Sequence, residues 1–375
     1  MTTDADRILP GSRVPLGRLP KVSLHDHLDG GLRAQTIIDL APAAGVELPA
    51  DTADALAAWF LESCSSGELV DYLKTFDITI AVMQTAQNLT RIAREFVEDL
   101  AADGVIYGEI RWAPEQHLAQ GLTLDQAVEA VQAGIDEGVD RVEAAGGWIR
   151  AGQLISAMRQ NDRGMEIAQL ALRHRDAGAH GFDIAGPEKG FLPSRFADAF
   201  DLLAREMFPV TIHAGEADGL ESIRSALVDG HALRLGHGVC IAEDIELEDA
   251  EDDDASYVTL GRLAQWIKDR GIPLETSPSS NLQTAAFTQW GPGIAGHPFD
   301  VLYQLGFRVT VNVDNRLMSA TSLTRELALL VDAFGYDADD VATFMINAAE
   351  AAFLPLEDRE DLIERIIAGF GSASD

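Results

Sequence analysis

Eight short segments rich in β-branched and aromatic residues recur along the 375-residue chain, separated by stretches with helical periodicity. This alternation is typical of a parallel sheet, because parallel strands need a long, usually helical, crossover between them. Eight such units, without internal repeats or linkers, predict an α/β fold of the (β/α)8 barrel type, with residues 1–375 forming a single domain. The predicted strands lie within Lys21–His27, Val105–Trp112, Trp148–Met158, Gly181–Ile184, Pro209–His213, Arg234–Val239, Ile272–Thr276 and Arg308–Asp314.

Additional helical patterns follow the first strand and the last one. After the first strand they cover Thr36–Ala44, Ala53–Leu61, Glu68–Gln84 and Ala86–Ala102, and after the last strand they cover Ser322–Phe334, Ala338–Ala351 and Leu356–Ile367. The first group is a longer excursion than a simple strand–helix unit needs. Its Tyr72, Phe76 and Met83, with the segment Trp59–Phe60, could line a lid, although ordinary helix packing is the expected role of each one.

The chain is strongly acidic, with 28 Lys and Arg against 61 Asp and Glu and a formal net charge of −33. Such a surface repels phosphate backbones and anionic lipids, so binding to nucleic acid or to a membrane surface is not expected. The acidic run Glu243–Asp254 shows no periodicity and predicts a solvated loop insertion. Cys64 and Cys240 are the two cysteines, too few for a disulfide framework or a Cys-based zinc site.

The N-terminal residues M-T-T-D-A-D-R-I-L-P lack the apolar core of a signal peptide, and the sequence contains no apolar run of about 18 residues. A cytoplasmic protein is therefore expected. The sequence makes no prediction about the oligomeric state.

Polar side chains gather at the predicted strand ends. Four of the nine histidines lie there, two of them in an H-x-H pair that shares one strand face because strand side chains repeat every two residues. Active sites of (β/α)8 barrels form at the C-terminal ends of the strands, so these residues should face one pocket. They are His25, His27, Asp29, Gly186, His213, Glu216, His237, Asp314 and Asn315.

Three neutral imidazoles and a carboxylate suit Zn²⁺ or a related divalent ion. Such an ion lowers the pKa of a water towards about 7 and so makes a nucleophile. In V-T-I-H-A-G-E, the strand of Val210–Ile212 ends in His213 and is followed after a glycine turn by Glu216. Glu216 is not needed as a ligand and could donate a proton, while His237 could hold or deprotonate the water. This set suits addition of water to an sp² carbon with loss of an amine.

The second predicted strand contains two charged residues, Glu109 and Arg111, which are not expected to belong to the pocket. Charges in a barrel strand usually pair with each other or with charges on other strands, so a structural role is predicted for both.

The chain resembles the adenosine deaminase family of the metal-dependent amidohydrolase superfamily. The resemblance extends over most of the chain, and its blocks stand in family order: H-D-H-L-D-G, D-I-A-G-P-E, T-I-H-A-G-E, L-G-H-G-V, S-P-S-S-N-L and V-N-V-D-N. The resemblance implies hydrolytic deamination of adenosine and 2′-deoxyadenosine to inosine and deoxyinosine in purine salvage. A small-molecule purine nucleoside would be the partner, with one Zn²⁺ per chain.

The resemblance also implies roles for individual residues. Glu216 would protonate purine N1, and His237 with Asp314 would orient the attacking water at C6. The Gly186 N–H would meet N3, and Asp29 would bind a ribose hydroxyl. The metal ligands would be His25, His27, His213 and Asp314, and the substrate contacts His27, Asp29, Gly186 and Asn315.

Three positions depart from the family pattern. Asn315 stands where an aspartate that faces N7 is common, and its amide can donate a hydrogen bond there without a proton of its own. Pro187 stands where an acid is common, and Arg316 where proline is common, so the substrate preference among 6-aminopurines stays open. The alternatives are deamination of adenine or a modified adenosine and, less favoured, a non-catalytic nucleoside-binding protein.

Overall fold

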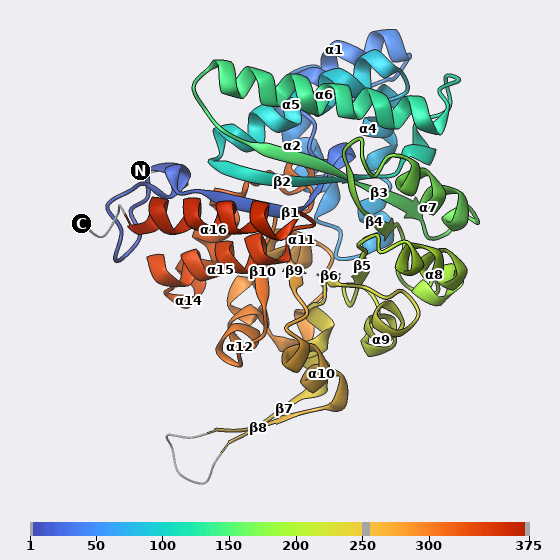
Figure 1. The fold of residues 1–375 in the computed structure, drawn as a ribbon. Helices are drawn as coiled ribbons and strands as arrows, with labels where there is room; N and C mark the ends of the chain where they lie inside the picture. Colours follow the sequence, from blue (N-terminus) through green and yellow to red (C-terminus); the bar gives the residue numbers. More distant parts are fainter. Residues whose placement is uncertain (1–2, 250–255, 372–375) are drawn as a thin grey trace.

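The computed structural model describes residues 3–249 and 256–371 (Figure 1). Its parallel strands form two four-stranded sheets, in the orders β1-β2-β3-β4 and β10-β9-β6-β5. Parallel bridges between Phe182 and Val210 and between Asp26 and Asp314 connect the two sheets at both edges. The strands are β1 (Lys21–His27), β2 (Val105–Trp112), β3 (Arg150–Met158), β4 (Ala179–Ala185), β5 (Thr211–Ala214), β6 (Arg234–His237), β9 (Leu274–Thr276) and β10 (Val309–Val311).

The strand order is therefore a ring, and the predicted (β/α)8 barrel is confirmed. Each predicted strand segment contains a strand of this ring, shifted by a few residues at some ends. An outer layer of helices surrounds the ring of strands (Figure 1), and apolar residues of these helices belong to the buried core. Its helices are α1 (Ala34–Ala44), α2 (Ala53–Cys64), α3 (Leu69–Leu73), α4 (Phe76–Val82), α5 (Ala86–Ala102), α6 (Leu124–Ala144), α7 (Gly164–Arg173), α8 (Ala197–Arg205), α9 (Leu220–Val228), α10 (Arg262–Arg270), α11 (Pro278–Gln283), α12 (Phe299–Gln304), α13 (Arg316–Ser319), α14 (Leu323–Phe334), α15 (Ala338–Ala351) and α16 (Leu356–Gly371).

Local sequence explains where several helices begin. Thr123 and Gln126 form a reciprocal capping box at the start of α6, and Asp337 with Asp340 does the same for α15. Within the described ranges 3–249 and 256–371, no helix is long and apolar enough to cross a membrane.

The helix predicted over Glu68–Gln84 is divided in the structure into α3 and α4. Between them the Thr75 hydroxyl donates to the Tyr72 carbonyl at 2.8 Å, and the Thr75 N–H also points to that carbonyl at 3.2 Å. A threonine side chain that takes a backbone carbonyl competes with the helical ladder. The break turns Tyr72 and Phe76 towards the open end of the barrel, where both line a cavity.

The acidic insertion is partly a hairpin rather than a loop. Strand β7 (Ile245–Asp249) pairs antiparallel with β8 (Ser256–Leu260), and the pair projects away from the barrel (Figure 1). Ile245 faces Leu260 and Leu247 faces Val258 across the ladder. The prediction of a loop over Glu243–Asp254 was wrong for Ile245–Asp249, because its many acids obscured the alternation of apolar and acidic residues. Residues 250–254 of that prediction lie outside the described part of the chain.

Candidate metal centre and active-site cavity

Four histidines and an aspartate from four strands of the barrel come together in one cluster. His25 and His27 come from β1, His213 from β5 and His237 from β6, and Asp314 follows β10. One ligating atom from each of His25, His213, His237 and Asp314 lies within 4.8 Å of the others. His27 Nε2 lies 3.1 Å from His213 Nε2 and 3.3 Å from Asp314 Oδ1. The four predicted ligands are thus brought together, and His237 joins the same cluster.

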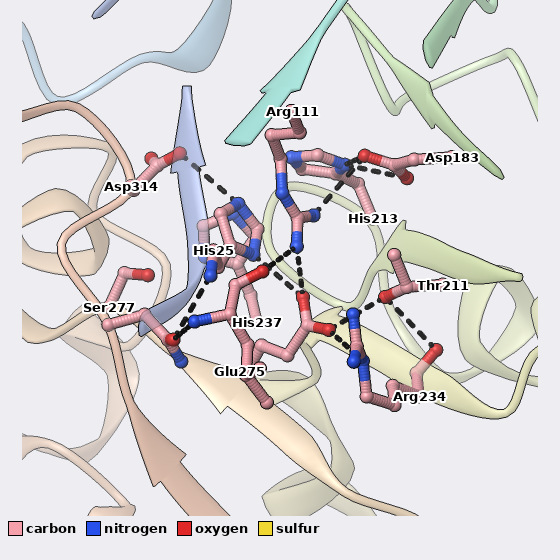
Figure 2. A network of polar contacts seen from close by, with 12 residues as sticks. His25, Arg111, Asp183, Thr211, His213, Arg234, His237, Glu275, Ser277 and Asp314 are labelled. Carbon is pink, nitrogen blue, oxygen red and sulfur yellow. Dashed lines mark hydrogen bonds and ion pairs between the residues drawn. The ribbon is translucent and has the colours of Figure 1, made fainter. Parts of the chain in front are cut away.

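Two buried carboxylates orient these imidazoles. His25 Nδ1 lies 3.0 Å from Glu275 Oε2, and His213 Nδ1 lies 2.9 Å from Asp183 Oδ2 (Figure 2). A carboxylate beside Nδ1 fixes the proton on that nitrogen and directs the Nε2 lone pair to the opposite side, as in many metal sites. Both Nε2 atoms then face the side on which Asp314 lies.

The donor set fits a metal ion. His25 Nε2 is buried, faces Asp314 Oδ1 at 3.2 Å and has no hydrogen-bond partner in the described ranges. His27 Nε2 and His213 Nε2 approach each other to 3.1 Å, a contact that a shared cation makes favourable. Burial lowers the pKa values of His27, His213 and His237, which favours the neutral form of these rings, the form in which an imidazole can ligate a metal. The cluster therefore suits a divalent ion.

The backbone is unusual at two of these positions. His237 and Asp314 have φ angles of 63° and 59°, in the left-handed region that residues with a Cβ seldom adopt. Such conformations persist where the surrounding structure imposes them, and they cluster at functional sites.

Charged residues occupy the barrel interior beneath the cluster of four histidines and Asp314, which is called the His/Asp cluster below. Glu275 accepts from Arg111 at 2.7 Å, from Arg234 at 2.6 Å and from Thr211 at 2.9 Å (Figure 2). Arg111 also pairs with Asp183, and Arg234 pairs with Glu109. The predicted structural pairing of Glu109 and Arg111 is confirmed, with partners on other strands. Each arginine thus joins carboxylates from different strands.

Glu275 and Asp183 were not predicted from the sequence as parts of the site. Each is a single acidic residue in a short apolar strand that borders the barrel interior, in L-E-T of β9 and G-F-D-I-A of β4. An acid at such a position is costly to bury unless it is paired, and this is the signal that could have identified both residues.

Glu216 lies beside the His/Asp cluster, on the loop after β5. Its Oε2 is 3.5 Å from His237 Nε2, and its Oε1 accepts a hydrogen bond from the Thr284 hydroxyl at 3.1 Å. Burial, followed by the nearby charges of Asp314 and Glu188, raises the pKa of Glu216 well above its usual value. This environment favours the protonated form of the carboxyl group.

A neighbouring asparagine fixes the tautomer of His237. Asn281 Oδ1 accepts from the Ser277 N–H at 3.2 Å, so its amino group is the end that lies 2.9 Å from His237 Nδ1. Nδ1 of the neutral ring therefore accepts, and the ring proton resides on Nε2, on the side of Glu216.

A cavity of about 340 Å³ opens over this cluster, within the range typical of small-molecule sites. Of the residues singled out in the sequence, Pro187, Tyr72 and Phe76 line it, whereas Met83 and Phe60 are buried in the hydrophobic core. The predicted site residues on its wall are His27, Asp29, Gly186, His213, Glu216, His237, Asp314 and Asn315.

Asn315 and Arg316 separate at the end of β10. Asn315 reaches the cavity over Gly30, where a Cβ would stand 1.8 Å from Asn315 Oδ1. Arg316 instead pairs with Asp26 Oδ2 at 2.9 Å, and its guanidinium stacks 3.9 Å above the Phe96 ring. Of the three departures from the family pattern, Asn315 and Pro187 thus face the cavity, and Arg316 supports β1 from behind.

Comparisons with known proteins agree with this geometry. A family model described as adenosine deaminase matches residues 20–369. The chain belongs to the adenosine deaminase family. It is 53% identical over 351 residues to adenosine deaminase 1 of Streptomyces coelicolor, covering 93% of this chain and 86% of that protein. It is 50% identical to the adenosine deaminase of Mycobacteroides abscessus over 355 residues, covering 94% and 96%.

The family resemblance extends to solved structures. The Arabidopsis protein ADAL, crystallised in complex with IMP, superposes with a TM-score of 0.78 at 26% sequence identity. The match covers 96% of this chain and 99% of the ADAL chain. The predicted family membership is confirmed.

Proposed function

We propose that this protein catalyses the zinc-dependent hydrolytic deamination of adenosine and 2′-deoxyadenosine to inosine and deoxyinosine, with release of ammonia, as a step of purine salvage. The observation that carries the proposal is the convergence of oriented imidazoles, Asp314 and Glu216 around one cavity of small-molecule size. The names of the relatives at 50–53% identity support it. So does the purine nucleotide bound to the Arabidopsis relative.

We assign the metal site to His25, His27, His213 and Asp314, with one zinc ion per chain. Nitrogen and carboxylate donors suit zinc, and two of the imidazoles have the carboxylate partners at Nδ1 that metal-bound histidines usually have. When bound, the metal lowers the pKa of a water in the site towards about 7 and so supplies a nucleophile at neutral pH.

Glu216 is the proposed acid. Its carboxyl lines the cavity, and burial and the charges around it favour the protonated form, which can donate a proton to purine N1. Protonation at N1 draws electrons from C6 and favours attack by water there. The Thr284 hydroxyl limits the orientations that this carboxyl can take.

His237 is proposed to hold the attacking water rather than to deprotonate it. The Asn281 amide donates to Nδ1 of the ring, which leaves the proton on Nε2, where it can donate to a water oxygen. The position of Nε2, 3.5 Å from Glu216 Oε2, allows both groups to act on the same purine carbon and its neighbouring nitrogen.

The remaining contacts would orient the nucleoside. The N–H of Gly186 is proposed to meet N3, and Asn315 to donate its amide N–H to N7. Asp29 and His27 would bind the ribose. Asp29 is 6% exposed and its Oδ1 has no hydrogen-bond partner among residues 3–249 and 256–371, so it offers an acceptor to a ribose hydroxyl.

An absorbance assay at 265 nm tests the proposal. Adenosine should be converted to inosine, a chelator should abolish the conversion, and added zinc should restore it. A panel that includes adenine and N6-substituted adenosines tests the alternative that another 6-aminopurine is the substrate. Absence of turnover with adenosine at any concentration contradicts the proposal, and faster turnover of another member of the panel replaces adenosine with that compound.

A further inference from the structure

A buried carboxylate outside the proposed catalytic set holds the loop that carries Glu216. Glu188 lies in the loop after β4, two residues beyond Gly186, and its side chain is 2% exposed. Four consecutive backbone N–H groups between β5 and α9 donate to its two oxygens. They belong to Gly215 (2.6 Å), Glu216 (3.1 Å), Ala217 (2.6 Å) and Asp218 (3.0 Å).

This arrangement is a nest, a concave run of amides whose partial positive charges converge on one anion. Gly215 permits the curvature, since its φ of 75° lies in the left-handed region. The Ser222 hydroxyl adds a further donor to Glu188 at 2.6 Å. Without the carboxylate, the buried N–H groups of Gly215 and Glu216 would lose their acceptor, which is costly. The loop shape and Glu188 therefore depend on each other.

We propose that Glu188 is a positioning residue, whose carboxylate holds the Gly215–Asp218 backbone in the shape that presents Glu216 to the substrate. Because Glu188 itself does not face the reacting atoms in this arrangement, its effect on catalysis passes through Glu216. This inference rests on the proposed function, since the role of Glu216 as proton donor does.

Glu188 also fixes the relative position of two loops of the proposed substrate site. Gly186 and Glu188 share one short loop, and Glu216 lies in the loop that Glu188 holds. The proposed contacts of Gly186 and Glu216 are with N3 and N1, two atoms of the same purine ring. A fixed distance between the two loops is therefore needed for both contacts to form together, and a displacement of about 1 Å in such a contact can cost about 100-fold in rate.

The decisive experiment is chemical rescue of Glu188→Ala. Glu188 also lines a chamber of about 430 Å³ beside Glu216, through which a small carboxylate can reach the emptied nest. We expect the variant to keep its metal and its KM for adenosine, and to lose about 100-fold or more in kcat. Formate should restore about tenfold or more of that loss in a saturable manner, and chloride at the same ionic strength should not.

A matched control is Glu95→Ala. Glu95 is also a buried carboxylate, but it lies on α5 and pairs with Thr36 and Arg91, away from the cavity. We expect this variant to lose stability, to retain kcat and to be unaffected by formate. If Glu188→Ala does not fold, Glu188→Gln decides, because an amide of similar size cannot accept from all the N–H groups. A lowered kcat at normal KM supports the inference, and a normal kcat overturns it.

Hydrogen exchange separates this inference from the proposed function. The amides of residues 215–218 should exchange faster in Glu188→Ala than in the wild type, and formate should slow them again. Unchanged exchange, a wild-type kcat, or a loss of kcat that formate leaves untouched overturns the inference. A wild-type protein that does not turn over adenosine contradicts the proposed function instead, and the exchange measurement still tests whether Glu188 holds the loop.

Discussion

Glu216 and Asp314 are two neighbouring carboxyl groups whose environments shift their pKa values in opposite directions. Burial and neighbouring negative charges raise the pKa of Glu216, whereas the histidines around Asp314 outweigh its burial and hold its pKa well below the usual value. In the proposed mechanism, such a pair supplies a proton donor and an anionic metal ligand within one site. The chemistry thus depends on what surrounds each carboxyl rather than on the residue type.

Replacement of Glu216 by glutamine should separate these roles. The amide keeps the shape and can still accept from Thr284, but it has no acidic proton to give to N1. We expect Glu216→Gln to retain its metal and to lose about 100-fold to 10,000-fold or more in kcat/KM for adenosine. Steady-state kinetics with metal analysis measures both quantities. Loss of the metal in this variant would contradict the role given to Glu216.

Asp29 offers a test of whether a sugar occupies the cavity. Its Oδ1 has no hydrogen-bond partner in the part of the chain that the structure describes, and it should accept from a ribose hydroxyl, a contact that a free base cannot make. We expect Asp29→Ala to raise KM for adenosine by about tenfold or more and to leave any turnover of adenine nearly unchanged. Kinetics with both compounds decides this point, and equal effects on the two would remove the ribose assignment.

At the scale of elements, the sequence was informative where local patterns determine structure. Period-two strands and helical stretches located the barrel, and polar residues at strand ends located the cavity wall. Glu188 and Glu275 were not predicted as parts of the site, because their partners lie 27 to 34 residues away in the sequence for Glu188 and 41 to 250 residues away for Glu275. The break at Thr75 was not predicted, because it depends on a side-chain hydrogen bond that the helical pattern does not indicate. The hairpin of β7 and β8 was not predicted, because its many acids hid the alternation that is typical of a strand.

The projecting hairpin should be dispensable for deamination. Its base is already closed, because the Gly261 N–H donates to the Asp244 carbonyl at 2.7 Å, and the Asp244 side chain accepts from the first turn of α10. We expect deletion of residues 245–260, with a short glycine linker, to leave kcat/KM within about twofold, since contacts that cap α10 remain. A large loss of activity with a normal melting temperature would instead give the hairpin a part in the site.

At the scale of the whole molecule, stability and function share the barrel interior. Arg111, Arg234 and Glu275 are fully buried and connect the strands through ion pairs. Glu275 also contacts Nδ1 of His25 in the His/Asp cluster. Removing one partner of such a buried pair costs about 3–5 kcal/mol, because the other charge is left unpaired. The network therefore holds the proposed metal ligands in place, and it occupies the space beneath them that an apolar core would otherwise fill.

Acid should lower the free energy of unfolding through His117, a histidine outside the His/Asp cluster. His117 is fully buried and bonded through Nδ1 to the Met83 carbonyl at 3.1 Å, and burial lowers its pKa from 6.5 to about 4. Between these values the unfolded chain binds a proton that the folded chain does not, so the free energy of unfolding falls as the pH drops from 6.5 towards 4. The depressed pKa corresponds to about 3 kcal/mol over the whole window.

The variant His117→Gln isolates this contribution, because glutamine can donate to the Met83 carbonyl but does not titrate. Urea unfolding at several pH values between 4 and 7 should show that the free energy of unfolding depends less steeply on pH in the variant. The slope should differ from that of the wild type by up to about 1.4 kcal/mol per pH unit, the effect of one proton. Parallel curves would mean that His117 is protonated in the folded protein or becomes exposed before global unfolding, and either result would contradict its assignment as a buried neutral ring.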